Sequence, residues 1–349
     1  MDIDKYIDRM KSIEEKLLYF LDREDNEEEN YQNLIQIINE EYILNDRHKI
    51  KSILHIVNNI SKNHHRGLNF FKKIEKILIQ LKEKIKNFYP NDEIFDIFKT
   101  NKRILLFLFE EKILTFDKYV FENMIEKKYQ KMDYFEYFSI EFKEFKEKQK
   151  QKDKISSISK IIDSKFDDEE EFKIKRLKGE NDGYLYKIIQ EDLIEEFIIY
   201  INKESYPIKS YVQNSIFETN YFLLKQNQTS LIEYAAFYGS SQIFKYLYKN
   251  GAQISNNLWL YSIHGNDEEI IHFLEEELRF QMHEIDNILK ESIKCQHNEI
   301  FNYILGNLIG WENYSFNPLL YCLKYYNFNF LDVKMIYQTE KNSFLIWKE

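Results

Sequence analysis

The feature that most limits how this chain can fold is a regular recurrence of small residues in its C-terminal part. Ala235, Ser262, Ser292 and Cys322 follow one another at spacings of 27, 30 and 30 residues. Residues at fixed offsets from them also agree in type. A Ser or Asn lies five residues before each, an apolar residue three before, and an Ile or Phe eight after. A self-similar period of this length predicts helical units that stack and bury their apolar faces against one another.

The stretch "SLIEYAAFYGSSQIFKYLYKNGA", residues 230–252, contains what one such unit needs. It holds all three alanines of the chain and two of its eight glycines. A Ser caps the first helix, a pair of Ala lets two helices approach, a Gly permits a left-handed turn, and an I-x-x-x-L pattern buries the second helix before a final Gly. The positions expected to build the repeats are Ser230, Ala235, Ala236, Gly239, Ile243, Leu247, Gly251, Trp259, Ser262, Ile270, Leu274, Leu289, Ser292, Ile300 and Ile304. The Asn residues at 257, 287 and 317 are expected to cap the later units.

This stretch resembles the ankyrin repeat, with its pattern T-P-L-H-x-A-A-x-x-G-x-x-x-I-V-x-x-L-L-x-x-G-A. More narrowly, "LIEYAAFYGS", "LWLYSIHGNDEEIIHFLEE" and "ESIKCQHNEI" are similar to ankyrin-type proteins expanded in trichomonad protists, in which the repeats accompany a domain of unknown function. "NHHRGLNFFKKIEKIL" and "NKRILLFLFEEKIL" are similar to the N-terminal half of that family. The resemblance implies an all-α fold, an ankyrin-like helical repeat solenoid preceded by a helical N-terminal region. The chain departs from the pattern at the turn glycine, which becomes Asn266, Gln296 and Tyr326.

Periodicity and charge divide the chain into three expected parts. Residues 1–140 form a helical N-terminal region with room for degenerate repeats, because Ile7, Met10, Ile13 and Leu17 recur at helical spacing and strand signals are almost absent. Residues 141–182 contain blocks of like charge such as "KEFKEKQKQKDK" and "DDEEE", which predict a charged linker or exposed helix. Residues 183–349 hold the ankyrin-like repeats, and a degenerate unit is expected over 184–211.

The composition argues against nucleic-acid binding, secretion and membrane insertion. A net charge of −10 argues against a nucleic-acid-binding protein, for which a basic face is expected. The two cysteines make no disulfide framework and suit a reducing compartment. The N-terminal stretch "MDIDKYIDRMKSIEEKLLYFLD" lacks the pattern of a signal peptide, and the longest apolar run, "ILLFLF", is too short to cross a membrane. We therefore expect a cytoplasmic protein that does not insert into membranes.

Sequence motifs give no support for catalysis, cofactor binding or metal binding. The chain has no G-x-S-x-G, P-loop, H-E-x-x-H or G-x-G-x-x-G sequence. His64 and His65 are adjacent, and Cys295 and His297 form C-x-H, so neither pair has the spacing of a structural zinc site. The Lys-rich segment at 72–86 could bind a membrane surface or an acidic partner, but its aromatic and apolar side favours a core helix.

The sequence therefore predicts a non-catalytic scaffold or adaptor for protein–protein interaction that uses the concave face of a helical solenoid. The residues expected on that face, just after each small-residue position, are Phe237, Tyr238, His264, Lys294, Lys324 and Tyr325. Two alternatives stay open: a regulatory or targeting arm of an enzyme whose activity lies in the N-terminal half, and a structural protein that self-associates. The partner and the oligomeric state are not predicted.

Overall fold

The fold is given by a computed structural model that describes residues 3–67, 69–125, 133–149, 169–278, 282–309 and 316–331. Throughout these ranges the regular structure is helical, with one isolated bridge between Tyr211 and Ser230 and no strand. The all-α class expected from the sequence is thereby confirmed. No helix in the described ranges combines the length and the apolar character that crossing a membrane requires.

The N-terminal half consists of helices whose apolar residues face a shared core. In α1 (Ile3–Asp22) the residues Ile7, Met10, Ile13 and Leu17 are all buried, as their spacing predicts. The other helices of this half are α2 (Glu27–Ile38), α3 (Glu41–Leu44), α4 (Arg47–Asn63), α5 (Phe70–Phe88), α6 (Asn91–Phe98), α7 (Lys102–Glu110) and α8 (Lys118–Met124).

The Lys-rich segment is a core helix, as its apolar side indicated. Ile74, Ile77 and Leu81 of α5 are fully buried. Lys73 is buried as well, and its ammonium group donates hydrogen bonds to the carbonyl oxygens of Leu21 and Arg23. The remaining lysines of α5 therefore lie around a helix whose apolar face is already covered by the rest of the protein.

The two ends of the predicted charged segment are helices with mostly exposed or half-buried side chains. α11 (Ser139–Gln149) and α13 (Glu169–Lys178) follow the short helix α10 (Tyr134–Tyr137), and the stretch between them, 150–168, lies outside the described residues. Phe142 and Phe172 are buried. Arg176 donates to the carbonyl oxygen of Tyr137 at 3.0 Å and to the carboxylate of Glu141 at 2.8 Å. Of the two forms expected for this segment, a charged linker or an exposed helix, the described ends agree with the second, held to the core by single aromatic and arginine side chains.

The C-terminal half is a series of short paired helices. Its elements are α14 (Tyr184–Gln190), α15 (Ile194–Lys203), α16 (Tyr221–Lys225), α17 (Leu231–Tyr238), α18 (Ser241–Lys249), α19 (Leu258–Gly265), α20 (Glu268–Glu277), α21 (Met282–Cys295), α22 (Asn298–Tyr303), the π-helical turn Ile304–Ile309 and α23 (Leu319–Tyr325). α17 packs on α18 and α19, α19 on α20 and α21, and α21 on α22 and α23. The helix pair α14–α15 coincides with the degenerate unit expected over 184–211.

The predicted caps differ from one pair to the next. The Ser230 hydroxyl accepts from the backbone N–H of Glu233, and the Glu233 carboxylate accepts from the backbone N–H of Ser230, which makes a capping box. Asn257 stands before α19 without a side-chain bond to it. The expectation that Asn287 caps a helix is wrong, because α21 already begins at Met282. The longer helix leaves that polar side chain in a helix interior.

The turn between paired helices is left-handed whether or not a glycine occupies it. Gly239 has a φ of 69°, as the position of a turn glycine requires. The residues that replace this glycine keep the same conformation, with φ of 52° at Asn266, 65° at Gln296 and 53° at Tyr326. A residue with a Cβ in this region costs roughly 1–2 kcal/mol. The later pairs therefore carry a local strain that their packing must offset.

The small residues lie where helices touch. Ala235 and Ala236 are completely buried. A Cβ placed on Gly265, at the end of α19, would lie 2.1 Å from the carbonyl oxygen of Ala236 and 2.7 Å from the backbone nitrogen of Gly239. Small residues gather in this stretch because backbone meets backbone there, with no room for longer side chains.

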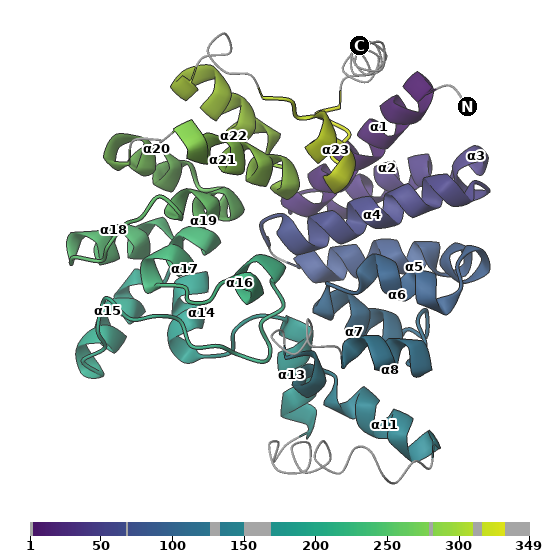
Figure 1. The fold of residues 1–349 in the computed structure, drawn as a ribbon, viewed down its shortest axis with the longest axis horizontal. Helices are drawn as coiled ribbons and strands as arrows, with labels where there is room; N and C mark the ends of the chain where they lie inside the picture. Colours follow the sequence, from purple (N-terminus) through teal and green to yellow (C-terminus); the bar gives the residue numbers. More distant parts are fainter. Residues whose placement is uncertain are drawn as a thin grey trace, which may run out of the picture.

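The two halves of the chain close on each other (Figure 1). The helices follow one another around a circuit, α16 lies inside it, and α4 packs against α16, α21 and α23. Glu14 of α1 joins the first helix to the turn that follows α23, because its buried carboxyl group accepts from the backbone N–H groups of Phe328 at 2.7 Å and Asn329 at 2.9 Å. The inner side of the helix pairs is therefore partly covered by the N-terminal half.

Candidate functional site

Three of the six residues expected on a free partner-binding face are covered by the protein itself. Phe237 and His264 are buried, and Tyr238 beside them is half-buried. The ring of Phe237 stacks on Phe222 of α16, and Nδ1 of His264 hydrogen-bonds the carbonyl oxygen of Asn63 in α4. The expectation that these residues lie open on a concave face is wrong, because α16 and the end of α4 occupy that face.

The other three predicted residues, Lys294, Lys324 and Tyr325, line a cleft of about 400 Å³. We call it the central cleft, because it lies between α4 on one side, α21 and α23 on the other, and α16. Its described lining consists of His55, Asn58, Asn59, Lys62, Asn63, Tyr221, Phe222, Lys225, Gln226, Glu291, Lys294, Lys324, Tyr325 and Tyr326. The cleft thus exists only because the two halves of the chain meet.

Positive charge converges on the central cleft. Lys62, Lys225, Lys294 and Lys324 come from four different helices, and Glu291 is the one carboxylate among the described lining residues. The ammonium groups of Lys62 and Lys225 lie 5.1 and 4.2 Å from the centre of the Tyr221 ring. In a chain of net charge −10 this is a local reversal of sign.

The single carboxylate is already used inside the fold. Glu291 accepts from Nζ of Lys294 at 2.5 Å and pairs with Nε2 of His264 at 2.8 Å. Burial alone would raise the pKa of Glu291, but these two partners lower it to about 2. Burial, together with the charges of Lys294 and Lys225, lowers the pKa of Lys62 to about 8. Lys62 is thus still cationic at neutral pH, although burial and then the neighbouring lysines destabilise its charge, and an anion in the cleft would relieve the repulsion between the lysines.

Sequence reasoning did not find Lys62 or Lys225. Both stand in short segments with no motif around them, and the chain has many other lysines. Lys62 is 232 residues from Lys294, and only the packing of α4 against α21 brings the two together. The more conspicuous lysine run, in α5, lies elsewhere.

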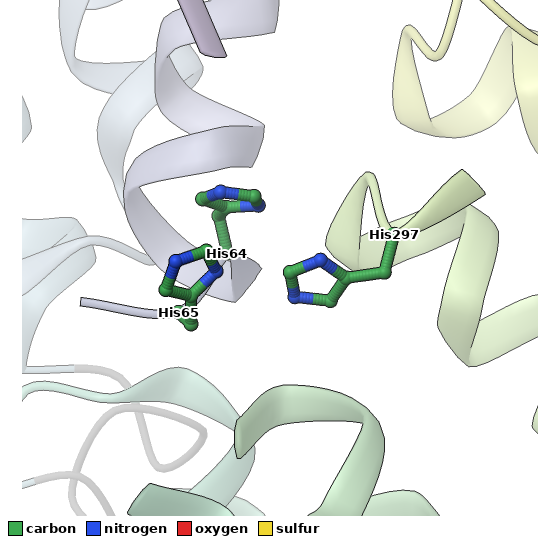
Figure 2. A group of neighbouring side chains, drawn as sticks. All are labelled: His64, His65 and His297. Carbon is green, nitrogen blue, oxygen red and sulfur yellow. The ribbon is translucent and has the colours of Figure 1, made fainter. Parts of the chain in front are cut away.

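Three histidines meet beside this junction (Figure 2). His64 ends α4, His65 follows it, and His297 stands before α22. The ring centroids are 4.3 Å apart for His64 and His65, 4.6 Å for His64 and His297, and 5.2 Å for His65 and His297. One ring nitrogen from each lies within 4.8 Å of the other two. The His64–His65 pair and the Cys295–His297 pair, neither of which has the spacing of a structural zinc site, thus both contribute histidines to one cluster.

The surroundings of this cluster favour uncharged rings at two positions. Burial, and then the nearby charge of His64, lowers the pKa of His65 to about 4. Burial lowers the pKa of His297 well below its usual value. Asp22 lies beside the cluster, with Oδ1 2.9 Å from Nε2 of His64 and 3.5 Å from Nε2 of His65. Two neutral imidazoles, a third imidazole and a carboxylate therefore share one small space.

A second group, formed by His264, Glu291 and Cys295, lies close by. Its charges satisfy one another: Glu291 binds both His264 and Lys294, and the other nitrogen of His264 binds the carbonyl oxygen of Asn63. Burial, and then the charge of Glu291, raises the pKa of the Cys295 thiol well above its usual value. A protonated thiol is a poor nucleophile and a poor metal ligand, so this group acts as an internal ion-pair network.

Comparison of the chain with known protein families, with curated proteins and with solved structures finds no match.

Proposed function

We propose that the protein is a non-catalytic scaffold for protein–protein interaction, in which the helix pairs of the C-terminal half form an ankyrin-like solenoid. Its binding site is the central cleft, and its ligand is an acidic segment of a partner protein. The convergence of Lys62, Lys225, Lys294 and Lys324 on one cleft of an acidic protein carries this proposal. Lys294, Lys324 and Tyr325 keep the partner-binding role expected from the sequence, and Lys62 and Lys225 join them.

The chemistry of the cleft matches carboxylate side chains on a peptide. Lys225 and Lys324 are exposed on flexible stems, and separate ammonium groups of this kind suit separate carboxylates along an extended chain. Tyr221, Tyr325 and Tyr326 add apolar surface between the charges. Aromatic and cationic side chains of this kind dominate the binding energy of many interfaces.

The test is binding of a fluorescently labelled, Glu-rich peptide to the full chain, measured by fluorescence anisotropy. The double variant Lys62→Gln with Lys324→Gln removes two cleft charges. Lys72→Gln with Lys249→Gln is the matched control, because it changes the net charge equally at two exposed lysines outside the cleft. We expect the cleft variant to lose about tenfold or more in affinity, roughly 1.4 kcal/mol, and the control to stay close to the parent.

Equal affinities for the two double variants would contradict the proposal, because they would show attraction to overall charge rather than to the cleft. A single-stranded oligonucleotide that binds more tightly than the peptide, with the same dependence on Lys62, would assign the cleft to nucleic acid instead. Circular dichroism of each variant checks that the fold is intact.

A further inference from the structure

The histidine cluster joins parts of the chain that are far apart in sequence. His64 and His65 stand at the end of α4, and His297 stands more than 230 positions later, between α21 and α22. Figure 2 shows the rings of His64 and His65 on one side and that of His297 approaching from the other. Whatever holds these rings together also holds the N-terminal half against the C-terminal half.

Two of the rings present buried nitrogen atoms that no protein group satisfies. Nε2 of His297 and Nδ1 of His65 are buried and have no hydrogen-bond partner. His297 as a whole is only 5% exposed. Buried polar atoms in native proteins nearly always have a partner, so an unpartnered pair in one cluster needs an explanation. An ion bound between the rings is one that their chemistry fits.

The third ring is oriented as a metal ligand would be. Nδ1 of His64 lies 2.8 Å from the carbonyl oxygen of Cys295, which can only accept, so Nδ1 carries the proton. In the neutral form of this tautomer, Nε2 carries the lone pair that can bind a metal. A backbone carbonyl on one nitrogen is the usual device that fixes the tautomer of a metal-binding histidine.

Asp22 completes the argument. Its Oδ1 lies 2.9 Å from Nε2 of His64. A proton on Nε2 would satisfy this contact, but it would leave the buried nitrogens of His65 and His297 without a partner. A metal ion bound by the three rings would replace that proton and serve all three rings.

We propose that His64, His65 and His297 bind one divalent transition-metal ion. Imidazole ligands suit zinc, which in some of its sites takes three protein ligands and keeps a fourth position open. Zinc–nitrogen bonds of about 2.0–2.1 Å place ligand nitrogens about 3.4 Å apart, so nitrogens that lie within 4.8 Å of one another must draw closer when the ion binds. The ion cross-links the end of α4 to the turn between α21 and α22.

The neighbouring group of His264, Glu291 and Cys295 is the rival position for a metal. It is the poorer one, because both nitrogens of His264 and the carboxylate of Glu291 have partners, whereas His65 and His297 each keep a buried nitrogen without one. The two positions differ in chemistry, since only the rival offers sulfur. A zinc–sulfur bond, at about 2.3 Å, is longer than a zinc–nitrogen bond. The ligand shell therefore identifies the site without any mutation.

The first experiment uses the unmodified full chain. After chelator treatment, zinc is added in competition with a chromogenic indicator, and the loaded protein is examined by X-ray absorption at the zinc edge. We expect one equivalent of tightly bound zinc with nitrogen and oxygen ligands only, including the scattering pattern of imidazole. Absence of saturable binding, or a sulfur atom in the ligand shell, would overturn the proposal.

The second experiment changes single ligands. His65→Gln is the gentler variant, because that side chain is 28% exposed, and His297→Gln is the stronger one. His272→Gln is the control, since His272 is exposed on α20. We expect each ligand variant to weaken zinc binding by about tenfold or more and the control to leave it unchanged. Zinc should raise the thermal midpoint of the parent and the control and leave that of His297→Gln unchanged. Unchanged affinity in His65→Gln would refute the assignment.

Discussion

Replacement of Gly265 by alanine tests the close contact of α17 and α19 most directly. The added Cβ would lie 2.1 Å from the carbonyl oxygen of Ala236 and 2.7 Å from the backbone nitrogen of Gly239. Ordinary carbon–oxygen contacts are about 3.3 Å or longer, so the two helix ends must separate by about 1 Å. Both atoms that would be hit are backbone atoms, which cannot turn away as a side chain can.

The size of the effect follows from two opposing contributions. Forced overpacking of a dense core typically costs about 1–3 kcal/mol, and an overlap with rigid backbone belongs at the upper end. The higher helix propensity of alanine relative to glycine stabilises the folded state by at most about 1 kcal/mol. The free energy of unfolding of Gly265→Ala should therefore fall by about 2 kcal/mol.

The assay is urea denaturation followed by circular dichroism, with Gly67→Ala as the control. A Cβ on Gly67 meets no atom within 4 Å, and its φ is not in the left-handed region. That variant should match the parent or gain up to about 1 kcal/mol from the stiffer unfolded chain. If the two variants unfold at the same urea concentration, α17 and α19 do not approach as described.

Three further predictions concern other parts of the fold. Ala235→Leu should lower the free energy of unfolding by about 1–3 kcal/mol, whereas Lys249→Leu on the exposed side of α18 should change little, as thermal denaturation will show. Gly239→Val should be less stable in urea than Gly239→Asn, because an Asn already holds the same turn at position 266; equal midpoints would exclude a left-handed turn. Burial raises the pKa of Glu14 to about 8, so its proton is held in the folded state while the unfolded carboxyl, near pKa 4.5, has lost it. Stability should then fall by about 1.4 kcal/mol per pH unit between about pH 4.5 and 8, and Glu14→Gln should flatten this slope; an identical slope in both would assign it to other groups.

The parts of the fold that follow from local chemistry could be predicted from the sequence. A capping serine, a left-handed glycine and an alternation of apolar residues act within one or two helical turns. Ser230, Gly239 and Ala235 therefore lie where their neighbours in sequence indicated. Asn287 failed as a cap because a helix can start earlier than its best capping residue when the preceding turn also favours helix.

The parts that depend on contacts between the two halves could not be predicted. The sequence around His264 contains no pattern that predicts its burial by α16 and the end of α4. The three clustered histidines belong to two pairs, and spacing within each pair argued against a metal. The packing of α4 against α21 brings the three histidines together, and this contact cannot be read from their spacing along the chain.

Closure of the chain also limits what the proposed binding site can accept. In an open stack of helix pairs, a folded partner can lie along the whole inner face. Here α4 and α16 occupy part of that face, and Glu14 joins the two ends of the circuit. What remains open to the four lysines is a cleft of about 400 Å³, which is large enough for a few side chains and too small for a folded domain. If the proposed function is right, an extended acidic segment therefore fits between α4 and α21 and a folded domain does not.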